Sequence, residues 1–151
     1  MPPLRPVKPE FDDVPLTPTR KAIAERVLQS AREMPVFDLH AEIIATPILA
    51  ARAAAKEELG SQAPSYNDFI LKGVATTLRR HPRLNAWFEN DVIRVAKQIN
   101  LAFAAATPEG VVLPTIFEAD QKTILEIAAE SREMIAMARA GKLRASLQAG
   151  A

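Results

Sequence analysis

The sequence predicts an α/β protein of the two-layer α+β kind, with a mixed or antiparallel sheet. Long runs with apolar residues at helical spacing are interspersed with pairs of short extended runs that are joined by turn residues. There is no strict strand–helix–strand alternation and no Gly-x-Gly-x-x-Gly, which excludes a dinucleotide-binding fold. A chain of 151 residues has the size of one domain.

The first two helices are predicted from their end signals. Thr17 is a hydroxyl N-cap, Pro18 is tolerated at the first helical position, and Pro35 ends the run. The second helix covers Pro47–Leu59, because Gly60 is a natural C-terminal stop.

The third and fourth helices carry equally local signals. Ser65 can accept a hydrogen bond from the amide of Asp68, as in a capping box, and the wide apolar face that follows predicts a well-buried helix. The fourth helix covers Lys122–Ala140 and stops near Gly141.

Extended segments fill the remaining chain. Val36–Thr46 alternates apolar and polar residues, which predicts a strand with one polar face. Ala86–Phe88 and Val92–Val95 flank turn-forming residues and predict a hairpin. Gln98–Thr107 and Val111–Phe117 repeat that arrangement, and their nearly continuous apolar character predicts central strands covered on both faces.

The composition excludes several classes of function. The balance of 19 basic and 18 acidic residues gives no electrostatic basis for binding nucleic acid or an anionic membrane. Without cysteine there is no disulfide, thiol nucleophile or thiolate-bound metal. The only histidines, His40 and His81, are too few for an all-histidine metal site, so no metal is expected.

The N-terminal region carries no targeting signal. Residues 1–13 are rich in proline and predict an extended arm. They lack the apolar core of a signal peptide. The most apolar stretch, Ala41–Ala55, is interrupted by Glu42, Pro47 and Arg52 and cannot cross a bilayer. We therefore expect a cytoplasmic protein.

Residue patterns alone reveal no catalytic machinery. His40 has no paired acid, so a solvated histidine is favoured over a general base. His81 stands at a helix end, where a cation suits the macrodipole. The acidic pairs are adjacent in sequence and need not converge on a substrate, and no serine lies in a nucleophile elbow.

The order of several sequence blocks nevertheless resembles a known family, the catalytic domain of the dihydrolipoyl acyltransferases, which are the core subunits of 2-oxoacid dehydrogenase complexes. The blocks are Val14–Ala24, Ser65–Gly73, His81–Ala86, Ala104–Pro114 and Ala138–Leu143. The resemblance implies a chloramphenicol-acetyltransferase-like fold with a mixed sheet, incomplete here. It also implies transfer of an acyl group between CoA, or a carrier thioester, and a thiol or alcohol acceptor.

The resemblance covers the first part of the family's domain, so residues 14–151 are predicted to be its N-terminal portion, following the arm at residues 1–13. The family's catalytic base lies in a His-x-x-x-Asp-Gly motif, into which neither His40 nor His81 fits. No catalytic residue is therefore assigned. Because Met1 stands just before the domain, no lipoyl domain is expected either.

The family's other functional positions fall on named residues here. Arg20 matches an arginine that pairs with the aspartate of the catalytic motif, although it would also suit an exposed first helical turn. Arg52 matches an arginine that contacts CoA, and Ser65 a serine of the same pocket, although helix capping also explains Ser65. Ala106 and Ile135 replace polar CoA-contacting side chains of some relatives.

Three hypotheses follow from this combination. The chain is half of a split acyltransferase whose catalytic histidine comes from a complementary chain, or a non-catalytic oligomerisation module, or a truncated fragment. No cofactor is expected to be covalently bound, and CoA or acyl-CoA is the expected substrate. The partners would be the complementary chain or further copies of this one, together with acyl-CoA or an acyl carrier. The reading frame that follows would discriminate the hypotheses by the presence of His-x-x-x-Asp-Gly.

Overall fold

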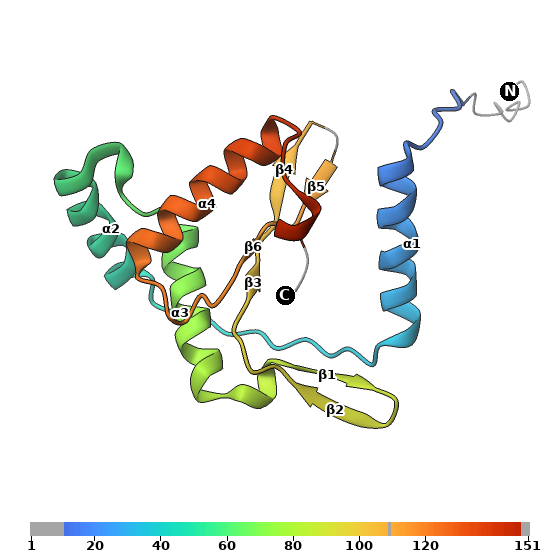
Figure 1. Cartoon of the computed structure of the whole chain (residues 1–151), viewed down its shortest axis with the longest axis horizontal. Coiled ribbons are helices and arrows are strands. Elements are labelled where there is room, and N and C mark those ends of the chain that lie inside the picture. Colours follow the sequence, from blue (N-terminus) through green and yellow to red (C-terminus); the bar gives the residue numbers. More distant parts are fainter. Residues whose placement is uncertain (1–10, 109, 149–151) are drawn as a thin grey trace, which may run out of the picture. The chain divides into compact units, whose positions relative to one another are not determined.

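The computed structural model describes residues 11–108 and 110–148, in two compact units with a boundary between Leu39 and His40 (Figure 1). The first ten residues of the predicted arm therefore lie outside the described part of the chain. The described residues form helices and small antiparallel sheets. This agrees with the predicted α+β class.

The first unit consists mainly of α1 (Pro18–Glu33). As predicted, Thr17 is the N-cap, and its side chain accepts a hydrogen bond from the Arg20 backbone N–H at 3.3 Å. The apolar side chains Val27 and Leu28 are exposed. The stability of this helix therefore depends on local signals, and its apolar residues remain available for contacts.

The predicted strand Val36–Thr46 is wrong. Residues 35–45 form no strand, and their apolar side chains, among them Leu39 and Ile44, are exposed. A strand needs an adjacent backbone edge with which to form hydrogen bonds, and no ladder to this segment forms within the described residues. His40 consequently lies in an exposed irregular segment.

The first helix of the second unit is α2 (Thr46–Leu59), which begins one residue earlier than predicted. Gly60 ends it at φ +55°, a left-handed conformation that favours glycine, as expected. A short 3-10 helix, η1 (Gly60–Gln62), then leads to α3 (Tyr66–Arg80).

The capping box of α3 is confirmed, but the expected deep burial of the helix is not. Leu71 and Ala75 are buried in the core, whereas Ile70 is 54% exposed and Val74 is also exposed. Within the described chain, other residues therefore cover only the side of this apolar face that carries Leu71 and Ala75. Helix α3 ends at His81, followed by η2 (Pro82–Leu84).

The predicted hairpin is confirmed as β1 (Ala86–Glu89) and β2 (Val92–Val95). Asn90 and Asp91 adopt φ values of 49° and 60°, the two left-handed residues that a tight hairpin turn requires. Phe88 pairs with Ile93 across the ladder.

The next two predicted strands form four short ones. β3 (Leu101–Ala102) pairs with β6 (Thr115–Ile116), and β4 (Ala105–Thr107) pairs with β5 (Gly110–Val112). The register is the same in both ladders, so they are one interrupted hairpin. Pro114 has no N–H to donate at the interruption, although its carbonyl still accepts from the Phe103 N–H at 3.0 Å.

The strands predicted at Gln98–Thr107 and Val111–Phe117 are therefore in the right places, but coverage on both faces is found at β6 and not at β5. Val111 and Leu113 are about half exposed, while Ile116 on the same segment is fully buried. The exposure of Val111 and Leu113 leaves one face of the β4–β5 part uncovered, whereas Thr115 and Ile116 in β6 are both buried.

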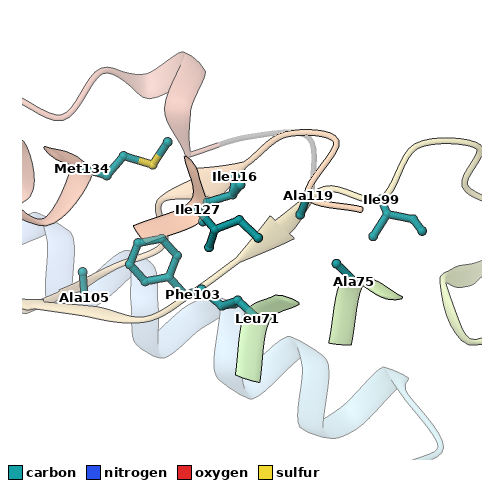
Figure 2. Packing of buried hydrophobic residues seen from close by; sticks show 9 residues of the cluster. All are labelled: Leu71, Ala75, Ile99, Phe103, Ala105, Ile116, Ala119, Ile127 and Met134. Atoms are coloured by element: carbon teal, nitrogen blue, oxygen red, sulfur yellow. The ribbon is translucent and has the colours of Figure 1, made fainter. Parts of the chain in front are cut away.

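The core of the second unit lies where α3 and α4 (Ile124–Arg139) pack against the short strands (Figure 2). Helix α4 begins with a second capping box, formed by Thr123 and Glu126. It ends at Arg139, close to the predicted stop near Gly141, whose N–H donates to the Ala138 carbonyl at 3.0 Å. A final 3-10 helix, η3, spans Ala145–Leu147. The core side chains are Leu71, Ala75, Ile99, Phe103, Ala105, Ile116, Ala119, Ile127 and Met134.

Candidate functional site

The structure brings two of the predicted site residues to the same place, the start of α3. Arg52, on α2, lies with its guanidinium carbon 4.6 Å from the centroid of the Tyr66 ring. Tyr66 is the first residue of α3 and directly follows Ser65. At this distance the positive charge interacts with the negative face of the ring. Arg52 and the α3 N-terminus thus form one candidate binding surface.

The guanidinium of Arg52 is not engaged by a carboxylate. Its Nε is buried and has no hydrogen-bond partner, and no ion pair joins Arg52 to any described residue. A guanidinium without such a partner retains the planar fork that suits a phosphate or carboxylate ligand. The site can therefore accept an anionic group.

The hydroxyl and the backbone N–H of Ser65 both take part in the helix cap. Its hydroxyl donates to Oδ2 of Asp68 at 2.7 Å and accepts from the Asp68 backbone N–H at 3.3 Å. The Ser65 backbone N–H donates to the same carboxylate oxygen at 2.7 Å. The capping role is thus shown by the geometry, while a contact between Ser65 and a ligand remains a prediction.

Asp68 links the candidate surface to α4, which the sequence patterns did not suggest. Its side chain is 3% exposed, and Oδ1 accepts a 2.6 Å hydrogen bond from the hydroxyl of Ser131. The carboxylate therefore receives donors from both helices. The capping-box motif identified Asp68 as a cap, but no local signal connects it to a serine 63 positions away.

Two basic side chains form hydrogen bonds that join α3 and η1 to α4 and to the segment before it. Lys72 donates from Nζ to the carbonyls of Asp120 and Lys122, at 3.0 and 2.6 Å. Arg132 donates to the side-chain and backbone oxygens of Gln62, at 2.7 and 3.1 Å.

Arg20 belongs to a different unit of the chain from Arg52 and Ser65. It lies in α1, in the first unit, and is exposed in the first helical turn. No described carboxylate forms an ion pair with it. The partner that the family resemblance implies for Arg20 stays a prediction.

The two positions that depart from the resemblance lie outside the Arg52 surface. Ala106 is exposed on β4, and Ile135 on α4 packs partly buried against the core. A separate cavity of about 210 Å³ is lined by Arg79, Asp120 and their neighbours, and Arg52 and Ser65 do not line it. Arg79 and Asp120 form an ion pair at 3.2 Å, so their charges already compensate each other.

The remaining candidates show no sign of a chemical centre. His40 and His81 are exposed, and among the described residues no group of three or more metal-binding side chains comes together. No helix in the described part of the chain is both long enough and apolar enough to span a membrane.

Comparison with known proteins establishes the family. The family model of the 2-oxoacid dehydrogenases acyltransferase (catalytic domain) matches residues 8–151, so the chain belongs to this family. A curated relative is the dihydrolipoyllysine-residue acetyltransferase component of the mitochondrial pyruvate dehydrogenase complex of Caenorhabditis elegans. The two are 34% identical over an alignment 141 residues long, which covers 89% of this chain but only 28% of that protein.

Solved structures show the same relationship. The dihydrolipoamide acetyltransferase of Azotobacter vinelandii matches with a TM-score of 0.90 and 29% identity, over 100% of this chain and 65% of that chain. In that enzyme, a serine, a histidine and an asparagine have been investigated for their role in the catalytic mechanism. The cubic core of a pyruvate dehydrogenase multienzyme complex matches with a TM-score of 0.89 and 28% identity, with the same coverage. The chain thus spans about two thirds of the solved chains it resembles.

Proposed function

We propose that this chain is the portion of a dihydrolipoyl acyltransferase domain that binds CoA or an acyl thioester, and that another chain supplies the catalytic His-x-x-x-Asp-Gly motif. The observation that carries the proposal is the free guanidinium of Arg52, held beside Ser65 at the start of α3 in a chain of the acyltransferase family. Arg52 and Ser65 are the proposed CoA-binding residues. CoA acts as a substrate, and no cofactor is covalently attached.

Acyl transfer from a thioester needs a base. In the family this base lies in the motif His-x-x-x-Asp-Gly, which does not occur in this sequence. The base takes the proton of the acceptor thiol or alcohol, the resulting nucleophile attacks the thioester carbonyl, and the CoA thiolate leaves. His40 and His81 are exposed and do not stand in the motif. In the proposal this chain contributes ligand binding, and Arg20 pairs with the aspartate of the incoming motif.

Exposed apolar surface supports the need for a partner. On one face of the β1–β2 hairpin, Phe88 and Ile93 are each 71% exposed and directly opposite each other. Val111 and Leu113 expose a second apolar stretch on the interrupted hairpin. Uncovered apolar faces and strand edges of this kind favour association. We infer that these faces are completed by the motif-bearing chain in a chloramphenicol-acetyltransferase-like domain.

The second candidate function is a non-catalytic oligomerisation module. It is favoured by the same exposed faces and by the similarity to the core of a multienzyme complex. CoA binding distinguishes the two candidates, because only the first requires Arg52 to bind CoA. Both candidates include the same domain assignment, which is an arm at residues 1–13 followed by the acyltransferase portion at 14–151. Both also include a cytoplasmic location.

Titration calorimetry with CoA tests the proposed site. Replacing Arg52 by alanine or glutamine removes a charge-assisted contact, and we expect weaker binding by about 1–3 kcal/mol. Arg80→Gln is the matched control, since Arg80 is an exposed arginine on α3 and is not part of the site. If Arg52→Gln binds CoA as tightly as the wild-type chain does, the assignment of Arg52 to the CoA site is wrong. Absence of CoA binding by the wild type would favour the oligomerisation module.

A further inference from the structure

The ring of Tyr66 contacts the proposed ligand-binding arginine and has no role in the capping box. Tyr66 is 45% exposed and sits on the first residue of a helix whose start is fixed by Ser65 and Asp68. The separation of 4.6 Å between the Arg52 guanidinium carbon and the ring centroid is well inside the range of about 6 Å for a cation–π contact. A rigidly placed aromatic face therefore holds a flexible cationic side chain.

The contact leaves the ligand-binding atoms of Arg52 free. A π face attracts the charge of the guanidinium but takes up little of its in-plane hydrogen-bonding capacity. Nε is buried without a partner, and the two Nη groups also form no hydrogen bond with any described residue, although they are not among the buried unpaired atoms. The Nη donors thus remain available for a phosphate group, whereas the buried Nε does not contribute.

We propose that Tyr66 is a positioning residue, whose ring presents the guanidinium of Arg52 to a phosphate group of the CoA ligand. This inference rests on the proposed function and adds a second residue to its site. An arginine fixed on a ring loses less side-chain freedom when the ligand binds, so the contact favours binding without touching the ligand. Removing the ring face then weakens binding through Arg52 alone.

Calorimetry with CoA on the 151-residue chain tests the proposal. We expect Tyr66→Leu to weaken CoA binding about two- to fivefold, the range of a partly exposed cation–π contact, and Tyr66→Phe to restore wild-type affinity because it keeps the ring. Tyr66→Gln repeats the test with another good helix former. Phe11→Leu, at an exposed aromatic residue, is the matched control for loss of an aromatic side chain.

A double-mutant cycle distinguishes positioning from a general structural effect. Once Arg52 is glutamine, Tyr66→Leu should cause no further loss of affinity, since its effect acts only through the guanidinium. Wild-type binding that is weakened by Arg52→Gln but unchanged by both Tyr66→Leu and Tyr66→Gln would overturn this inference and leave the proposed function intact. Equal losses in Tyr66→Phe and Tyr66→Leu would overturn it as well. A wild-type chain that does not bind CoA would overturn both.

Discussion

Removing the hydrogen bond between Ser131 and Asp68 tests most directly how α3 and α4 are joined. The Asp68 carboxylate is 3% exposed and accepts from the Ser131 hydroxyl at 2.6 Å, as well as from the backbone and side chain of Ser65. Ser131→Ala removes one donor from a buried carboxylate and creates no steric clash. A hydrogen bond to a charged group contributes about 1.5–3 kcal/mol, so the free energy of unfolding should fall by that amount.

Urea denaturation followed by circular dichroism measures the loss, and the melting temperature should fall by about 3–10 °C for a chain of this size. Ser146→Ala is the control, because Ser146 is exposed on η3 and forms no hydrogen bond in the described structure. In the Asp68→Asn background, Ser131→Ala should cost clearly less, since the charged acceptor is gone. A change below about 0.5 kcal/mol in Ser131→Ala would refute the reasoning, because that is the range of an ordinary surface substitution.

Two further predictions concern pH and association. The backbone N–H and then the hydroxyl of Thr123 donate to Glu126 and lower the pKa of that carboxyl below its ordinary value of 4.5. The stability that the charged Glu126 contributes is therefore complete above pH 4.5 and is lost as the pH falls through the lower pKa of the folded state. Glu126→Gln should accordingly flatten the pH dependence of the urea midpoint below pH 4.5. Light scattering at micromolar concentration should show an oligomer, or a complex with a motif-bearing chain, and Phe88→Glu should weaken it. A stable, monodisperse monomer would contradict that association.

Local signals allowed most helix boundaries to be predicted from the sequence. Thr17, Ser65 and Gly141 act through hydrogen bonds within a few residues of themselves, so their roles are visible in the sequence and are confirmed in the structure. The hairpin turn at Asn90 and Asp91 was predictable for the same reason.

Features that depend on distant residues could not be predicted. The alternation in Val36–Thr46 satisfies the period of a strand, but a strand forms only where a second edge is present. The contacts of Asp68 with Ser131 and of Arg52 with Tyr66 arise from helix packing, which residue spacing does not specify. The interruption at Pro114 was detectable, because a residue without an N–H cannot continue the ladder.

The functional positions also differ in whether the sequence alone could identify them. Arg52 and Ser65 were found through the resemblance to the family, and the structure places them at one helix start without testing their role. Tyr66 was not singled out, since its importance depends on the arginine from another helix that lies over its ring.

Acyl transfer in a reconstituted mixture tests the central claim most directly. Formation of free CoA from acetyl-CoA, with dihydrolipoamide as acceptor, is followed by chromatography, because the transfer consumes one acceptor thiol for each CoA thiol released. It is measured for this chain, for a polypeptide bearing His-x-x-x-Asp-Gly, and for the two together. The chain alone should show only the buffer rate, because a missing general base typically costs about 10²–10⁴-fold. The mixture should show turnover that falls with Arg52→Gln but not with Arg80→Gln. Turnover by the chain alone that His40→Ala abolishes would contradict the claim, because it would place the base in this chain.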